Sequence, residues 1–286
     1  MNIRIVRKKI KSVDNVKKIT KAMELVSAVK MKKFHQLAEE STPYQMFLEK
    51  GIRNIVLNIE KYISSLLEPR LGTQDKELAI LISTNKGLCG AFNISLARFL
   101  IKNTTNKTEI VTIGKKGANL SNSLGFKVIA DFSSIDPFEN VSALFEFVYS
   151  QFIEGKYNKI KLFYNSYVSV IQYQPIVETL LPVKFDEKKI ESEVQDFYKN
   201  YVIEPSAEEI MHSLLLSYIE QKIRFAVVQT QAGEHSARMI AMQNATNNAS
   251  DILLSLTQLR NKLRQEKITN ELLDMITAKE SVESNN

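Results

Sequence analysis

The sequence predicts an α/β protein in which two long terminal helices form a coiled coil and an α/β domain is inserted between them. Apolar residues recur at helical spacing over both ends of the chain, and residues 206–286 contain no proline and a single glycine. Seven of the nine glycines lie instead in the middle segment, residues 71–183. Even about fifty helical residues would make a rod of roughly 75 Å. Because no compact domain of this size is that wide, the apolar stripe of the last helix needs a partner helix.

The first helix is expected over residues 3–42. One set of its apolar residues keeps three-and-four spacing: Ile3, Val6, Ile10 and Val13. A second set repeats that spacing one position out of step: Val16, Ile19, Met23 and Val26. The slip predicts a seam that is locally over-wound. Thr42-Pro43 predicts a break or kink, because the residue before proline avoids the helical region, and a further helical stretch is expected over residues 44–67, ending near Glu68-Pro69.

Between residues 71 and 183, short apolar runs alternate with helical stretches. The strands are expected at residues 78–83, 110–114, 127–132 and 159–168, and the helices at residues 94–101, 115–124 and 141–153. This alternation predicts βαβ units and a mainly parallel, Rossmann-like sheet. Residues 172–183 predict an extended edge segment, because Pro175 and Pro182 are confined to an edge strand or a loop.

The last helix is expected to begin at Ser206, because Ser206-Ala-Glu-Glu209 has the spacing of a capping box. The charged and aromatic residues 185–205 predict only a helical or connecting segment. Three domains are therefore expected. They are an N-terminal coiled-coil helix with a connecting helical segment (residues 1–68), the α/β domain with its connecting segment (69–205) and a C-terminal coiled-coil helix (206–286).

Composition and charge narrow the class of protein. The 286 residues are 44% hydrophobic and 24% charged, typical of a soluble globular protein, and no apolar run approaches the roughly twenty residues of a membrane span. No secretory signal follows Met1. A mitochondrial presequence is disfavoured because Lys, and not Ser and Arg, dominates the N-terminal segment. The lone Cys89 is expected to be a small buried hydrophobic residue. Residues 1–35 hold eleven lysines and arginines against Asp14 and Glu24. This basic helix is expected to meet nucleic acid, an anionic membrane or an acidic protein surface.

Motifs for catalysis or cofactor binding are weak. Gly114-Lys-Lys-Gly117 lacks the spacing of a phosphate loop and predicts a tight strand-to-helix turn with solvated lysines. Residues 84–90 follow a strand at the sheet edge, where ligands often bind, but a turn is favoured there. The three histidines have no zinc-like spacing, and His235 is expected to be solvated or ion-paired beside Arg238. We therefore expect no catalytic residue, metal or cofactor.

Longer motifs give a far more specific indication. They are residues 11–31, the run from Glu234-His-Ser-Ala-Arg238 to residue 251, residues 263–272, and the shorter Lys86-Gly-Leu-Cys-Gly-Ala-Phe-Asn93, Leu180-Leu-Pro182 and Glu204-Pro-Ser206. Over nearly the whole chain these residues resemble the γ subunit of F-type ATP synthases. The sequence departs from the family at Gly233, where Ser is usual and a kink becomes possible, and at Ser217, where proline is frequent.

The resemblance implies a central-stalk rotor, an antiparallel coiled coil of both termini inside a hexamer of alternating α and β subunits. The α/β domain would lie outside it, near the ε subunit and the ring of c subunits. Such a chain is non-catalytic, and its turning forces the three catalytic β sites into different states, which couples proton or sodium flow to ATP synthesis. The lack of a second cysteine favours a bacterial-type subunit on the cytoplasmic face of the inner membrane, attached indirectly through the c ring.

The resemblance also implies positions that bind the β subunit. Lys21 and Met23 would meet the acidic lever region of β. Four further residues would hydrogen-bond to a loop of β higher in the shaft: Arg264, Gln265, Thr269 and Glu271. A mostly apolar bearing near the tip would consist of Leu272, Met275 and Ile276.

Two other hypotheses belong to different classes. The first is a basic coiled-coil scaffold that binds nucleic acid through its N-terminal helix. The second is a small-molecule enzyme that uses the loop at residues 84–90.

Overall fold

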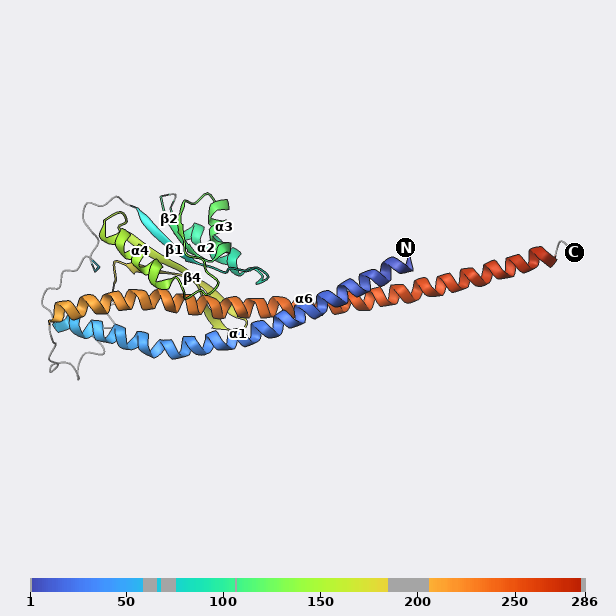
Figure 1. Ribbon diagram of the computed structural model, residues 1–286, viewed down its shortest axis with the longest axis horizontal. Coiled ribbons are helices and arrows are strands. Elements are labelled where there is room, and N and C mark those ends of the chain that lie inside the picture. Colours follow the sequence, from blue (N-terminus) through green and yellow to red (C-terminus); the bar gives the residue numbers. More distant parts are fainter. Residues whose placement is uncertain (1, 59–65, 68–75, 106, 185–205, 284–286) are drawn as a thin grey trace. The chain divides into compact units, whose positions relative to one another are not determined.

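The computed structural model describes residues 2–58, 66–67, 76–105, 107–184 and 206–283 (Figure 1). Its elements follow the order α1 (Ile3–Asn58), β1 (Glu77–Ile82), α2 (Phe92–Asn103), β2 (Glu109–Ile113), α3 (Lys115–Ser123), β3 (Val128–Asp131), α4 (Val141–Ile153), β4 (Lys159–Ser169), β5 (Gln172–Leu181) and α6 (Ala207–Glu283). By packing, the chain divides into two compact units. We call residues 1–27 with 239–286 the terminal unit, and residues 28–238 the sheet unit.

The sheet unit contains one five-stranded sheet with the order β3-β2-β1-β4-β5. The strands from β3 to β4 are parallel, whereas β5 pairs antiparallel with β4 as an edge strand. Both the mainly parallel sheet and the edge position of residues 172–181 were predicted and are confirmed. Pro175 is tolerated in β5 because an edge strand has a side that needs no backbone donor.

The central strand β1 has both faces buried, because successive side chains point to opposite sides of a sheet. Leu78, Ile80 and Ile82 join a core that includes residues of α1, α4 and α6, while Ala79 and Leu81 join a second core beneath α2. The sheet is therefore covered by the terminal helices and α4 on one face and by α2 on the other. This arrangement explains why residues 78–82 read as one continuous apolar run.

A break or a kink was predicted at Pro43. Helix α1 runs through this proline, so the break is wrong. Proline in a helix interior loses one backbone hydrogen bond and costs about 3 kcal/mol. Ala38, Leu48 and Ile52 are buried on either side of Pro43, and this packing offsets the local cost. The hydroxyl of Thr42 also donates to the carbonyl of Ala38 at 2.8 Å.

Helix α6 begins where the capping box predicted, because the backbone N–H of Glu209 donates to Ser206 Oγ at 3.2 Å. The helix then continues through Gly233, so the kink that this residue made possible does not interrupt it. A Cβ at Gly233 would lie 3.1 Å from Cε2 of Phe92. The glycine therefore allows a close approach of α6 to the start of α2.

The terminal unit pairs the first part of α1 with residues 242–263 of α6. A set of buried and half-buried positions on α1 keeps three-and-four spacing throughout: Ile3, Val6, Ile10, Val13, Lys17, Thr20, Glu24 and Ser27. Asp14 and Met23 are half-buried beside this set. The matching positions on α6 are Met242, Thr246, Ala249, Leu253, Leu256, Arg260 and Leu263. The seam is thus a regular heptad seam, and the predicted over-winding is wrong.

Polar residues occupy the middle of this seam, which explains the error. Thr20 and Thr246 face each other with their hydroxyl oxygens 2.8 Å apart. Three of the four apolar residues that suggested the slip lie off the seam, since Val16, Ile19 and Val26 are all more than half exposed, while Met23 is half-buried beside the seam. The predicted shift of the seam therefore came from apolar residues that lie on the outer face of α1.

Several sequence expectations lie outside the described residues. They include the helix end near Glu68-Pro69 and the segment 185–205. The domain boundaries after residues 68 and 205 also fall at such residues, and the three-domain division stays a prediction.

Candidate functional site

The residues expected to bind β all lie in the terminal unit. On α1, Lys21 is exposed and its ammonium lies 2.8 Å from Glu24, while Met23 is half-buried beside the seam. The side chain of Glu24 is mostly buried, and its second oxygen has no hydrogen-bond partner among the described residues. Lys21 therefore presents its charge at the surface, next to a carboxylate that belongs to the seam.

The four polar positions on α6 are all exposed: Arg264, Gln265, Thr269 and Glu271. Thr269 donates its hydroxyl to the backbone carbonyl of Gln265, and Glu271 pairs with Lys267 at 3.3 Å. Among the residues that the structure describes, the side chains of Arg264 and Gln265 make no hydrogen bond or ion pair. Both side chains keep their hydrogen-bonding groups available to an external partner.

The structure does not bring the two predicted contact regions together. Thr20 lies opposite Thr246, so Lys21 is level with that part of α6. Arg264 follows Thr246 by eighteen positions, which is roughly 27 Å along a helix axis. The two regions would therefore meet different parts of a partner.

Past Leu263, the described side chains of α6 are exposed up to residue 279. The N-terminus of α1 lies well before the C-terminus of α6 in Figure 1, so this end of α6 has no helix beside it within the terminal unit. Leu272 and Ile276 are each 55% exposed and Met275 is 70% exposed. These apolar side chains at helical spacing form a surface that is open to a partner.

A buried polar cluster in the sheet unit was not foreseen. We call it the Arg238 cluster, formed by Glu234, His235 and Arg238 of α6 with the loop between β1 and α2. The Arg238 side chain is only 8% exposed and lies 2.6 Å from a carboxylate oxygen of Glu234. Its Nε donates to the carbonyl of Gly87 at 3.2 Å and its Nη2 to the carbonyl of Lys86 at 3.3 Å.

His235 completes the cluster and is neither solvated nor in an ion pair, contrary to expectation. It is 7% exposed and stacks on Phe34 of α1, with the ring centroids 5.5 Å apart. Nη1 of Arg238 lies 3.2 Å from Nδ1 of His235. Because Arg has no acceptor, Nδ1 must accept this bond, and the imidazole is neutral.

The titration of the cluster follows from its burial and charges. Burial, with Arg238 and Lys30, lowers the pKa of His235 to about 4. Burial also raises the pKa of Glu234, against the opposing effects of Arg238, Gln231 and Lys30. The i, i+4 spacing of Glu234 and Arg238 was the signal in the sequence, but nothing in it showed that the pair is buried.

The two glycine-containing loops serve the fold. The carbonyls of residues 86 and 87 bind Arg238, and Asn93 donates to Thr84 at 2.8 Å, so turn geometry is confirmed there. In the other loop, a Cβ at Gly114 would lie 2.3 Å from the carbonyl oxygen of Ser83, while the lysines are exposed. The tight turn with solvated lysines is confirmed. Cys89 is buried, as expected.

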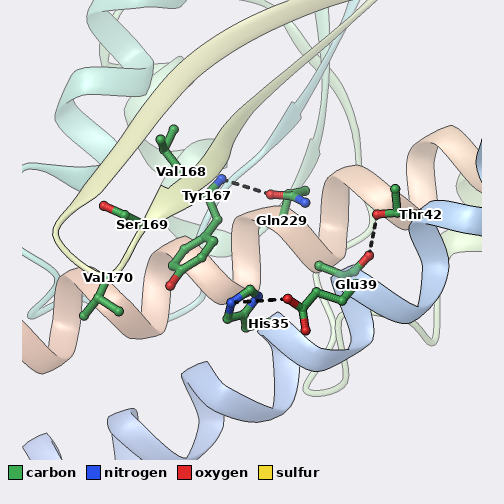
Figure 2. A pocket seen from close by; sticks show the side chains of 9 residues that line it. His35, Glu39, Thr42, Tyr167, Val168, Ser169, Val170 and Gln229 are labelled. Carbon is green, nitrogen blue, oxygen red and sulfur yellow. Dashed lines mark hydrogen bonds and ion pairs between the residues drawn. The ribbon is translucent and has the colours of Figure 1, made fainter.

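A half-open pocket of about 440 Å³ lies between α1 and the turn joining β4 to β5 (Figure 2). On the α1 side, Nε2 of His35 lies 3.9 Å from a carboxylate oxygen of Glu39 one turn along the helix, and on the other side the backbone N–H of Tyr167 donates to Gln229 at 3.0 Å. His35 is half-buried, Glu39 is exposed, and the hydroxyl of Tyr167 contacts the sulfur of Met31. The lining supplies no nucleophile with a base and orienting group beside it.

The part of the chain that the structure describes offers neither a metal site nor a membrane span. No group of three or more His, Cys, Asp or Glu side chains in this part is placed to hold a metal ion. None of the described helices has the length and apolar character needed to cross a membrane.

Comparison with known proteins decides the family. A family model described as ATP synthase matches residues 2–282. The ATP synthase gamma chain of Verminephrobacter eiseniae (strain EF01-2) is 35% identical over 283 residues, which cover 95% of each chain. The chain belongs to the ATP synthase gamma-chain family. A second relative of the same name, from Paracidovorax citrulli (strain AAC00-1), is 34% identical and covers 97% of this chain and 98% of its own.

Solved structures share the fold. A chain in the Euglena gracilis mitochondrial ATP synthase, rotational state 3, matches 99% of this chain and 95% of its own with a TM-score of 0.69 and 19% identity. A chain in the Tetrahymena thermophila mitochondrial ATP synthase, central stalk and c ring, matches 79% of this chain and 99% of its own with a TM-score of 0.58 and 23% identity. The expected combination of long terminal helices and an inserted α/β domain is thus an established fold.

Proposed function

We propose that this chain is the central-stalk rotor subunit of an F-type ATP synthase. Its terminal unit would turn inside a hexamer of α and β subunits, and its sheet unit would meet the ε subunit and the c ring. The chain itself would be non-catalytic and would work by favouring different states of the three catalytic β sites in turn. Because each orientation must stabilise one β state over the others, the function requires an exposed, asymmetric surface.

The observation that supports this function best is the surface of the terminal unit. Its two helices bury a seam with each other and leave every predicted β-binding residue exposed or half-buried. On α1, seven of the eight lysines and arginines before residue 28 are exposed: Arg4, Arg7, Lys8, Lys9, Lys11, Lys18 and Lys21. This basic surface complements an acidic partner, as the proposed lever region of β would be.

The proposed roles differ between the two contact regions. Lys21 and Met23 would contact the lever region of β. Arg264 and Gln265 have free side-chain donors for a loop of β, with Thr269 and Glu271 on the same stretch of helix. Leu272, Met275 and Ile276 would form an apolar bearing, where contacts without directional hydrogen bonds allow turning.

The nucleic-acid scaffold and the small-molecule enzyme have less support. The comparisons lend no support to a nucleic-acid scaffold, since the relatives named above are ATP synthase gamma chains. The enzyme hypothesis depended on the loop at residues 84–90, whose carbonyls at Lys86 and Gly87 are bound by Arg238. We propose a location on the cytoplasmic face of a bacterial membrane, with attachment through the c ring.

An assembly experiment tests the proposal. The chain is mixed with α and β subunits from the same source, and native mass and Mg-ATP hydrolysis are measured. We expect one copy to enter a complex of three α and three β subunits and to raise multisite turnover. A chain that stays free, with turnover unchanged, would refute the rotor function, and a salt-dependent shift of nucleic acid would then revive the scaffold hypothesis.

A further inference from the structure

We infer that Arg238 is a positioning residue for torque transfer, which locks the α/β domain to the helix pair. The inference rests on the proposed function, because only a rotor has torque to pass on. The α/β domain is inserted between α1 and α6, so any force applied to the domain must reach these helices through side-chain contacts and the two connections. The contacts that matter are those that resist sliding.

The Arg238 cluster joins three elements at one point. The Arg238 guanidinium binds two carbonyls of the loop between β1 and α2 and also pairs with Glu234 on its own helix, α6. Through His235 the cluster reaches α1, because the imidazole stacks on Phe34 with an interplanar angle of 15°. One buried cluster therefore connects the loop after β1 to both terminal helices.

The chemistry of the contact suits a lock. Apolar side chains hold two surfaces together but allow them to slide, whereas a planar guanidinium that binds several acceptors fixes distance and angle. The loop has left-handed backbone directly after these carbonyls, since Leu88 and Gly90 have positive φ of 63° and 60°. A non-glycine residue such as Leu88 adopts this conformation only where the surroundings impose it.

The place of Arg238 along α6 supports the same role. Arg238 is the last residue of α6 that packs in the sheet unit, and from residue 239 the helix belongs to the terminal unit. The cluster therefore holds the last part of α6 that packs in the sheet unit. A contact at this position fixes the loop after β1 to that end of the packed stretch of α6.

A second polar contact lies further back on α6. Lys222 lies 3.1 Å from Glu178 of β5, and Tyr164 of β4 donates to the same carboxylate at 2.7 Å. Arg238 follows Lys222 by sixteen positions, which is roughly 24 Å along the helix. Gln229 and Ser236 of α6 add directional contacts between these two, to the backbone of Tyr167 and of Val170. Directional contacts spread over this length of helix resist pivoting of the sheet, and Arg238 is the last of them along α6.

The test measures angular stiffness in the assembled complex. The α and β subunits are fixed to a surface, the enzyme is stalled with a non-hydrolysable ATP analogue, and a probe is attached at Lys102→Cys, an exposed position on α2. Arg238→Lys keeps the charge and removes the forked donor. We expect a broader distribution of probe angles and a lower ratio of ATP synthesised to ATP hydrolysed in membrane vesicles.

Lys161→Gln is the matched control. Lys161 pairs with Glu77 of β1 at 2.5 Å and donates to the carbonyl of Asn103 at the end of α2 at 3.4 Å, and the side chains of the pair are mostly buried. These contacts lie within the α/β domain and do not reach α1 or α6. A merely structural role for Arg238 would lower the melting temperature in both variants and leave both angle distributions at the wild-type width, which would overturn the inference.

Three further outcomes are decisive. If Arg238→Lys does not assemble, Phe34→Leu removes the stacking partner on α1 and must broaden the distribution in its place, and an unchanged width there counts against the lock. If the wild-type probe does not turn when ATP is supplied, the rotor function fails and this inference fails with it. If the wild type turns and the Arg238 variant is as stiff, only the inference fails.

Discussion

At the scale of single residues, His235 lies among charges that make its protonation costly. Arg238 is on its own helix and Lys30 on α1, and both oppose a second positive charge. The imidazole is the acceptor of an Arg238 donor, so a proton on Nδ1 would also break that bond. Acid should therefore weaken the contact between α1, α6 and the loop after β1.

The first prediction concerns the pH dependence of stability. The pKa of His235 falls from 6.5 to about 4 on folding, so between these values the unfolded chain binds the extra proton. The stabilisation is complete above about pH 6.5 and is lost as the pH falls to about 4, up to roughly 3 kcal/mol. Unfolding free energies measured from pH 7 to pH 4 should fall more steeply for the wild type than for His235→Gln. If the free energy of unfolding fell equally with pH in the two proteins, the lowered pKa of His235 would be contradicted.

The sequence did not predict this cluster. The family resemblance singled out the motif from Glu234 to Arg238, but His235 was expected to be solvated or ion-paired beside Arg238. Burial could not be predicted, because it depends on the loop at residues 86 and 87, about 150 positions earlier in the chain. Long-range contacts of this kind leave no local pattern.

At the scale of elements, the second prediction contrasts two helical glycines. Replacing Gly by Ala in a helix gains about 1 kcal/mol where space permits. A Cβ at Gly51 meets nothing within 4 Å, whereas at Gly233 it would press on Phe92, whose buried ring packs against Tyr173 at 4.8 Å. We expect Gly51→Ala to raise the free energy of unfolding by up to about 1 kcal/mol. Gly233→Ala should lower it by up to about 2 kcal/mol, since overpacking costs about 1–3 kcal/mol.

Thermal unfolding of the two glycine variants decides the point. Equal stabilisation in both would show that α6 does not press on Phe92. If Gly51→Ala lowered the stability, neighbouring atoms would have to lie close to a Cβ at this position of α1.

The third prediction tests the seam of the terminal unit. Val6 is fully buried and Val26 is 57% exposed. Val6→Ala removes two buried methyl groups and should lower the free energy of unfolding by about 1.5 kcal/mol, at roughly 0.8 kcal/mol for each. Val26→Ala should change it by less than about 0.5 kcal/mol. Both changes are measured by chemical unfolding. A larger loss for Val26→Ala than for Val6→Ala would support the over-wound seam instead.

Most elements could be predicted from the sequence, and the errors have physical causes. Short buried strands with turn residues between them were recognised because both signals are local. The helix through Pro43 was missed because tertiary packing overrode a local preference, as buried Ala38 and Leu48 show. The seam was misread because Thr20 and Thr246 satisfy each other within it, which a search for apolar residues overlooks.

At the scale of the whole molecule, the family resemblance predicted the site more fully than the residue pattern did. Arg264 and Gln265 have no chemical signature of their own in the sequence. The structure adds that both are exposed on a single helix. Their roles toward β stay predictions, because the partner that would bind them is a separate chain.

The fourth prediction addresses those roles. Arg264→Ala and Gln265→Ala should each lower ATP turnover of the assembled complex, with Arg264→Ala the larger loss, because charge-assisted hydrogen bonds are roughly twice as strong as neutral ones. The melting temperature of the isolated chain should not change, since both side chains are exposed. Lys262→Ala, at another exposed position of α6, is the control and should keep wild-type turnover. Unchanged turnover in both variants would refute the assigned contacts.

Rotation itself is the most direct measurement of the proposed function. A probe at Lys102→Cys is followed in a complex whose α and β subunits are fixed to a surface while Mg-ATP is supplied. A rotor must turn in one direction and stop when ATP is removed. If the chain is incorporated and ATP is hydrolysed but the probe only fluctuates about one angle, the chain is a static component of the complex and not its rotor.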